Sequence, residues 1–208
     1  MSKLDEARDP ETTPERLVEL SRDREWEVRA AVAGNTSAPK NVLVALEQDP
    51  QSGVRCAVAF NLNATDVALS HLALDDDWMV RWGVALNPNT ATELLEQMSF
   101  DPNWRVRQGV AQHPASFGAP LAHLVHDANE GVVIEVLRNP KAPTATLAAL
   151  AISDNWNFRL AVASNPSAST EIVTLLTRDP NASVAETAHA TLDLRPSSAI
   201  PWVMRGAW

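Results

Sequence analysis

The chain has 208 residues, of which 45% are hydrophobic, so it carries enough apolar surface to bury a core. Its net charge is -9: residues 1–104 hold 18 acidic and 9 basic side chains, whereas residues 105–208 hold 8 of each. Because phosphate groups are bound through clustered Lys and Arg, this balance counts against nucleic acid and anionic membrane as partners.

The N-terminal residues are charged, and no run of about 18 apolar residues follows anywhere in the chain. We therefore expect neither a signal peptide nor a membrane span, and we expect a cytoplasmic protein. The single cysteine, Cys56, cannot form a disulfide within the chain or hold a structural metal or iron-sulfur cluster alone. No cofactor is expected.

One sequence fragment recurs along the chain and predicts its architecture. It reads Asp-x-x-Trp-x-Val-Arg-x-x-Val-Ala-x-Asn-Pro, and its first position, here called position zero, returns every 26 residues. Position zero is occupied by Asp23, Asp49, Asp75, Asp101, Asp127, Ser153 and Asp179. Seven units in one register, without an insertion, indicate a repeat protein.

Each repeat is expected to contain two short helices. The first carries Leu at spacing i, i+3, as in residues 13–20, and is opened by Ser, Thr or Pro. The second is expected to begin at position zero, where Asp or Ser would cap it and Pro50, Pro102 or Pro180 would follow as the first helical residue. It is expected to end at an Asn-Pro pair such as Asn87-Pro88.

Helices of about eight or nine residues are too short to be stable alone, so we expect each repeat to stack on its neighbour. Columns of Leu and Val would form the stacking surface, and small residues at position eight, such as Gly83 and Gly109, would let neighbouring helices approach closely. We predict an all-α solenoid of seven two-helix repeats, a single domain over residues 1–191. The units are residues 10–35, 36–61, 62–87, 88–113, 114–139, 140–165 and 166–191.

These columns resemble two known repeat families. A Leu-rich helix followed by Asp and then by Val-Arg is similar to the HEAT repeat, although HEAT units are longer. The 26-residue period, the Trp before Val-Arg and the Val-Ala-x-Asn-Pro ending resemble the variant leucine-rich repeat more closely, over about residues 9–191. That resemblance implies a right-handed superhelix of alternating α-helices and 3₁₀-helices, and it leaves open which type each predicted helix is. One member of that family carries a Cys-ligated iron-sulfur cluster, for which this chain has no set of cysteines.

Position six carries a column of arginines that could bind anions. We interpret it instead as a structural ladder between stacked units, because an Asp stands six residues before nearly every Arg. The predicted ladder residues are Asp23, Arg29, Asp49, Arg55, Asp75, Arg81, Asp101, Arg107 and Arg159. The ladder is expected to break at Val133 and Ala185, where the Arg is absent.

Four tryptophans at position three, Trp26, Trp78, Trp104 and Trp156, could be stacking platforms for bases or sugars. We interpret them as a packed spine of indoles between neighbouring helices.

No catalytic residue and no metal site is predicted. Cys56 is interpreted as a tolerated surface residue, because only Arg55 stands near enough in sequence to lower the pKa of its thiol. His123, His126 and Asp127 offer at most three metal ligands, so we interpret them as a solvated helix end. The acidic run of residues 75–77 is interpreted as a cap followed by an acidic loop.

Positions four, seven and eleven of the second helix share one face, and they differ strongly between repeats. In repeats two and three this face is apolar, although polar residues would cost nothing there. By the resemblance to HEAT repeats, it would line the concave side, where an apolar patch fits a binding partner. The predicted partner-binding residues are Phe60, Met79, Trp82, Leu86, Ile134 and Leu160. The alternative is a superhelix that curls tightly enough to bury this face.

The hypothesis from these patterns is a non-enzymatic scaffold that binds a protein or peptide, with acidic residues that favour a basic partner. One alternative is a nucleic-acid binder that resembles the HEAT-like alkylpurine DNA glycosylases, for which the basic residues are too few. Another is a module that assembles with itself, for example as a homodimer. Residues 192–208 break the period and are expected to cap the last repeat or to dock elsewhere through Trp202 and Trp208.

Overall fold

The computed structural model describes residues 2–195, and every regular element in that range is an α-helix. The predicted all-α fold is confirmed, and the alternative of a 3₁₀-helix in each repeat is wrong for these residues. The helices are α1 (Lys3–Arg8), α2 (Pro14–Leu20), α3 (Trp26–Gly34), α4 (Lys40–Leu46), α5 (Ser52–Phe60), α6 (Asp66–Leu72), α7 (Trp78–Leu86), α8 (Thr92–Met98), α9 (Trp104–Gln112), α10 (Ala119–Leu124), α11 (Glu130–Arg138), α12 (Thr144–Leu150), α13 (Trp156–Ser164), α14 (Thr170–Leu176) and α15 (Ala182–Asp193).

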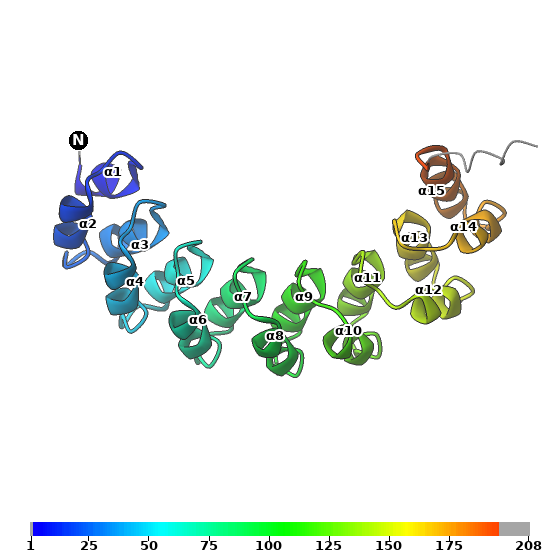
Figure 1. Cartoon of the computed structure of the whole chain (residues 1–208), viewed down its shortest axis with the longest axis horizontal. Helices are drawn as coiled ribbons and strands as arrows, with labels where there is room; N and C mark the ends of the chain where they lie inside the picture. The colour runs from blue at the N-terminus through cyan, green and yellow to red at the C-terminus, as the bar shows by residue number, and fades with distance from the viewer. Residues whose placement is uncertain (1, 196–208) are drawn as a thin grey trace, which may run out of the picture. The chain divides into compact units, whose positions relative to one another are not determined.

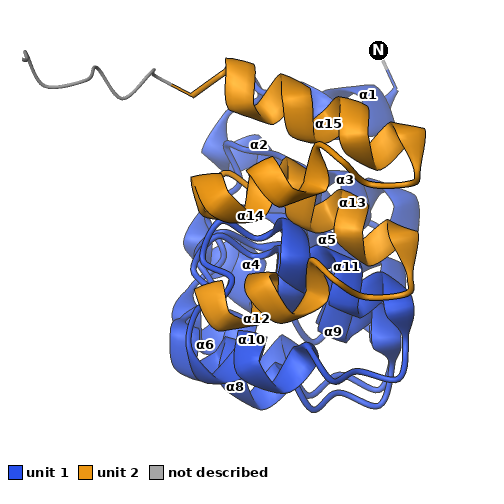
Figure 2. Ribbon diagram, turned by 90° about the vertical axis from the view of Figure 1, so that its right-hand side faces the viewer, with its two compact units in different colours: residues 1–143 blue, residues 144–208 orange. Residues whose placement is uncertain are grey.

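The chain divides into two compact units, residues 1–143 and residues 144–208 (Figure 2). Unit 1 contains α1 to α11, and unit 2 contains α12 to α15. The single domain predicted over residues 1–191, its repeat boundaries and the handedness of the superhelix stay predictions. Residues 196–208, which hold most of the predicted cap or docking tail, lie outside the described residues.

Unit 1 is built from two layers of helices (Figure 1). The odd-numbered helices pack directly on one another in one layer, and the even-numbered helices lie in the other layer, against the odd-numbered helices on either side. Within unit 1 the odd-numbered layer, which carries the Val-Arg motif, lies on the concave side (Figure 1). Unit 2 repeats the arrangement, with α13 packed on α15 and α14 against both.

The periodic apolar columns form the core of both units. In unit 1 the Val residues at positions five and nine are almost wholly buried, and so are Leu17, Leu43, Leu69, Leu95 and Leu121, which stand one period apart. Val162, Val173 and Val184 are buried in unit 2. Because each helix has only six to twelve residues, burial against the neighbouring repeats must supply most of its stability. The predicted stacking surface is therefore confirmed.

The glycines at position eight allow a close approach between neighbouring odd-numbered helices. A Cβ atom added to Gly83 would lie 3.0 Å from the Cβ of Ala59 and 3.2 Å from the ring of Phe60. At Gly109 the corresponding neighbours are Ala85 at 3.0 Å and the ring of Trp82 at 3.2 Å. These two repeats need Gly because an aromatic side chain projects from the preceding repeat.

The predicted caps of the second helices are wrong. From α3 onward, each odd-numbered helix begins three residues after position zero, and its N-cap residue stands at position two. Asp77, for example, caps α7 by accepting the Met79 N–H at 2.9 Å. Pro50 and Pro102 stand before the helices, in the turn. The Asp at position zero does not cap the helix, because its carboxylate has two other partners, described below. The predicted helix ends at Asn are confirmed, since Asn35, Asn61, Asn87, Asn139 and Asn165 are the C-cap residues.

Candidate functional site

The arginines at position six join neighbouring repeats. Arg55 donates from Nε and Nη2 to the carboxylate of Asp75 at 2.6 and 2.9 Å, and from Nη1 to the carbonyl oxygen of Asp49 at 2.8 Å. Each Arg thus pairs with the Asp that follows it by 20 residues, in the next repeat, and bonds only the backbone of the residue six positions before it. Arg29, Arg81, Arg107 and Arg159 make the same contacts, so Asp127 and Asp179 are ladder residues that the sequence analysis missed.

The Asp carboxylates of this ladder also hold the turn before the next helix. Asp75 accepts the Asp77 N–H at 2.9 Å while it accepts both nitrogens of Arg55. Burial by itself raises the pKa of Asp75, but the hydrogen bonds from Arg55 and Asp77 outweigh it, so the pKa lies below its usual range. Since this carboxylate stays charged, it neutralises the guanidinium of Arg55, which is then not available to bind a phosphate.

A second ladder runs through the Asn that ends each Val-Arg helix. Asn61 Nδ2 donates to the carbonyl oxygens of Ala33 and Asn35 in the preceding repeat, at 2.7 and 2.9 Å, and its Oδ1 accepts the Asn63 N–H at 2.8 Å. One side chain therefore satisfies helix-end carbonyls of one repeat and the turn of the next. Asn35, Asn87 and Asn139 do the same.

His113 replaces Asn in this second ladder. Its Nδ1 accepts the Ala115 N–H at 3.0 Å, so the proton lies on Nε2, which donates to the Asn87 carbonyl oxygen at 2.9 Å. The neutral ring thereby reproduces the bond of an Asn side chain to the turn and one of its two bonds to the preceding repeat. Burial lowers the pKa of His113 below its usual value, because a charged imidazole would lose its water shell there.

Helix α1 is a shortened repeat that the sequence analysis missed. Lys3 stands 26 residues before Arg29 and pairs with Asp23 at 2.7 Å, as an Arg of the ladder would. The carbonyl oxygens of Ala7 and Asp9 accept both bonds from Asn35. Unit 1 therefore begins with half a repeat that closes both ladders at the N-terminal end.

The predicted partner-binding residues of repeats two and three lie on α5 and α7, two neighbouring helices of the layer on the concave side of unit 1. We call Phe60, Trp78, Met79, Trp82 and Leu86 the aromatic face. Phe60 and Met79 are 41% and 45% exposed, and Trp82 and Leu86 are half-buried. The rings of Phe60 and Trp82 meet edge to face, with centroids 5.6 Å apart, and the ring of Trp78 lies 6.5 Å from that of Trp82. Such ring pairs hold their side chains in place and leave part of each surface open.

The tryptophans at position three do not form a spine of indoles. Among the described residues, no two of these four rings stack on one another; Trp26 is 42% exposed and lies over Gly53 of the next repeat. In repeats three and four the guanidinium of Arg105 lies 5.2 Å from the ring centroid of Trp78 and 4.5 Å from that of Trp104. Trp26, Trp78 and Trp104 instead pack against residues at position four, so the predicted spine is wrong.

Ile134 and Leu160 do not join the aromatic face. Ile134 is half-buried on α11, and α9 lies between it and α7 with Arg105, Gln108 and Gln112 at the equivalent positions. Leu160 is half-buried on α13, in unit 2. The apolar surface of unit 1 on this side therefore spans α5 and α7.

The remaining chemical candidates make local contacts. Cys56 is half-buried, its Sγ lies 3.6 Å from the Met79 carbonyl oxygen, and burial raises the pKa of its thiol. Asp127 pairs with Arg107, and the ring of His123 stacks on Phe100 at 4.2 Å. Within residues 2–195, no group of three or more His, Cys, Asp or Glu could hold a metal ion, and no helix could cross a membrane.

The helices, the two ladders and the layered packing define the described chain as an all-α repeat solenoid. Its structure is similar to that of a solved leucine-rich repeat variant described as having a novel repetitive structural motif. The TM-score is 0.59 with 25% sequence identity, over 91% of this chain and 86% of that one. The resemblance to the variant leucine-rich repeat is thus confirmed.

Two further solved structures match more loosely. One is a designed armadillo repeat protein, with a TM-score of 0.28 and 18% identity over 92% of this chain and 90% of that one. The other is described as an engineered protein, with a TM-score of 0.32 and 18% identity over 93% of this chain and 96% of that one. No protein-family model matches the sequence, and no curated protein is similar enough to match it.

Proposed function

We propose that unit 1 is a binding scaffold without catalytic activity of its own, which holds a protein or peptide segment against the aromatic face. The observation that carries the proposal is the exposure of Phe60 and Met79 at positions that differ from repeat to repeat. The periodic Val and Leu columns already fill the core, so stacking does not require these apolar side chains. Aromatic and Met side chains are well suited to anchor a partner.

The acidic side chains near this face favour a basic partner, although the guanidinium of Arg105 lies against the ring of Trp78. Residues 41–104 hold nine acidic and two basic side chains, and both basic ones, Arg55 and Arg81, are paired in the ladder. Complementary charge speeds association and selects among partners. The same pairing removes the arginines that a nucleic-acid groove would need, so the alternative of a DNA-binding protein is disfavoured.

The test compares what two matched variants capture from an extract of the source cells. The double variant Phe60→Ser, Met79→Ser removes the two exposed anchors, and the double variant Val44→Ser, Val67→Ser removes two exposed apolar side chains from the even-numbered layer. We expect proteins that the parent and the Val44, Val67 variant both retain to be lost from the Phe60, Met79 variant. Equal capture by all three proteins, with unchanged unfolding midpoints, would contradict the proposal.

A further inference from the structure

A pocket of about 500 Å³ lies beside the loops that follow α6 and α8, and we call it the Leu74–Phe100 pocket. Leu94 and Met98 of α8 contribute to its lining together with Leu74, Phe100, Asp76 and Arg81. It shares no residue with the aromatic face. The volume is within the range of about 300 to 1,000 Å³ that is typical of ligand sites.

The two side chains that name the pocket are apolar although most of their surface is in contact with solvent. Leu74 is 83% exposed and Phe100 is 65% exposed, and they stand one period apart in repeats three and four. The equivalent residue is polar in four of the other five repeats, which have Arg22, Gln48, His126 and Arg178 there, and it is Ile152 in the fifth. The fold therefore does not require an apolar side chain at this position, whereas a binding partner would benefit from it.

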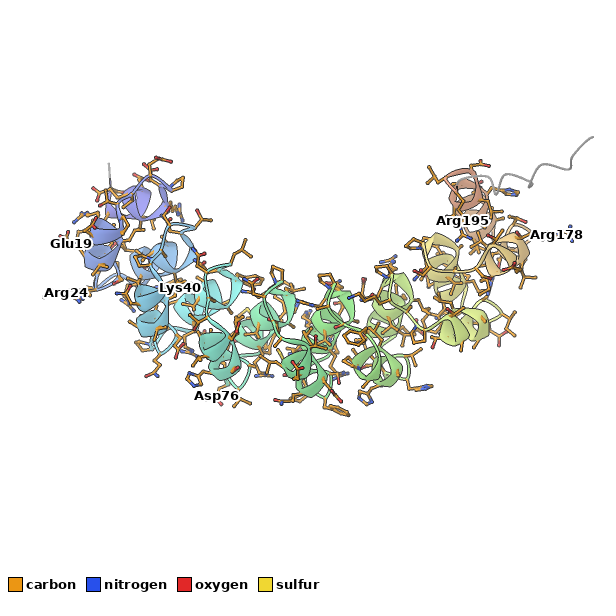
Figure 3. The ribbon with its side chains drawn as sticks, viewed as in Figure 1. Glu19, Arg24, Lys40, Asp76, Arg178 and Arg195 are labelled. Atoms are coloured by element: carbon orange, nitrogen blue, oxygen red, sulfur yellow. The ribbon has the colours of Figure 1, made fainter. Side chains whose placement is uncertain are left out.

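The charge at the pocket is negative. Arg81 donates from Nε and Nη2 to the carboxylate of Asp101 at 2.6 and 3.1 Å, and from Nη1 to the carbonyl oxygen of Asp75 at 2.6 Å. Asp75 is in turn neutralised by Arg55. Among residues 2–195 Asp76 has no ion-pair partner; it is exposed and lies at the outer edge of unit 1 (Figure 3). A cation of the partner therefore finds an uncompensated carboxylate next to the apolar walls.

We propose that the Leu74–Phe100 pocket is a second binding site, which takes an apolar side chain of a peptide segment that carries Lys or Arg beside it. Leu74 and Phe100 supply the apolar contact, and Asp76 selects the basic neighbour. A peptide fits the pocket better than a free small molecule, because pockets for small molecules bury about 70 to 90% of the ligand and this one has two largely exposed walls. The rest of a peptide can lie on the surrounding acidic surface of residues 41–104.

The test selects random 12-residue peptides, displayed on phage, against the full chain and against the double variant Leu74→Ser, Phe100→Ser. We expect sequences that the parent retains and the double variant loses, and we expect these to carry an apolar residue within two positions of Lys or Arg. If no enriched sequence depends on the two side chains, or if the dependent sequences are acidic, the proposal is wrong. Both substituted side chains are exposed, so the loss of the stacking between Phe100 and His123 is expected to lower the unfolding midpoint only slightly.

A titration of one selected synthetic peptide checks the role of the charge. Asp76→Lys is expected to weaken its binding at least tenfold at low salt, and Leu175→Ser, which removes an exposed apolar side chain from unit 2, is expected to leave binding unchanged. Equal binding by the Asp76→Lys variant would overturn the assignment of Asp76. The Phe60→Ser, Met79→Ser variant is expected to bind the peptide as the parent does. The experiments can therefore contradict the proposal for one site without contradicting the proposal for the other.

Discussion

Arg81 and Asp101 stand 20 residues apart and form a two-pronged ion pair, with Nε and Nη2 of Arg81 donating to the two carboxylate oxygens at 2.6 and 3.1 Å. The side chains are only 13% and 6% exposed. The pair therefore has few competing water molecules, and its stabilising effect depends on both partners being present.

The effects of removing the two partners of this pair are expected to be less than additive. Arg81→Val leaves the carboxylate of Asp101 buried without its guanidinium, at a cost of about 2 to 3 kcal/mol. The combination Arg81→Val, Asp101→Ser copies Val133 and Ser153, which occupy these positions later in the chain. Urea unfolding is expected to show that the double variant loses at least about 1 kcal/mol less than the sum of the single variants. Additive losses would mean that the pair is not coupled.

His113 is expected to make the stability of the chain depend on pH near neutrality. The pKa of His113 is lower in the folded chain than its ordinary value of 6.5, so the unfolded chain binds more protons below that pH. The contribution is fully present above about 6.5 and is lost as the pH falls toward the lower, folded pKa. His113→Asn restores the side chain found in the other repeats, and unfolding midpoints measured from pH 8 to pH 5 should then lose this slope. An unchanged slope would show that another group is responsible.

Gly83 is expected to tolerate a methyl group better when Phe60 is shortened. In Gly83→Ala the new Cβ lies 3.0 Å from the Cβ of Ala59 and 3.2 Å from two ring carbons of Phe60, and the resulting overpacking should cost about 1 to 2 kcal/mol. In the Phe60→Ala background the same change should cost less, because the ring is gone and Ala favours helix more than Gly does. A double-mutant cycle by urea unfolding measures the difference. The same cost in both backgrounds would contradict this account of the glycine.

Glu47 is expected to be replaceable by Ser with a gain in stability. Its Oε1 is 2.9 Å from His71 Nδ1, but its Oε2 is the one buried side-chain oxygen or nitrogen within residues 2–195 that has no hydrogen-bond partner. At the same position Ser21 and Ser99 donate to the carbonyl oxygens three residues earlier, at 2.8 and 2.7 Å. Glu47→Ser should raise the free energy of unfolding by about 1 kcal/mol. Gln48→Ser, at the exposed neighbour, is the control, and a loss at Glu47 would show that the contact with His71 matters more.

The period alone was enough to predict the helices and the core, because each column of Val and Leu occupies the same buried environment in most of the seven repeats. The partner of each Arg was harder to predict, since an Asp stands both 6 residues before it and 20 residues after it. The predicted cap failed for a related reason. Asp at position zero is a good cap by composition, but its carboxylate is taken by the Arg of the preceding repeat and by the turn.

The half repeat at the N-terminus had a signal in the sequence. Lys3, Ala7 and Asp9 stand one period before Arg29, Ala33 and Asn35, but Glu6 replaces the Val that would have marked the repeat. For the aromatic face, the sequence placed Phe60 and Met79 on one side of their helices. It could not show that Trp82 would be half-buried, because that depends on how closely Gly109 lets the next helix approach.

The asparagine ladder constrains how a molecule of this kind can change its length. Each Asn reaches carbonyl groups 26 and 28 residues earlier, and each paired Arg reaches a carboxylate 20 residues later. A deletion or insertion inside an odd-numbered helix, between its Arg and its Asn, rotates the two side chains relative to each other, so at least one ladder loses its partner in that repeat. Growth by duplication of complete units leaves every bond intact, so such a chain lengthens in steps of 26 residues.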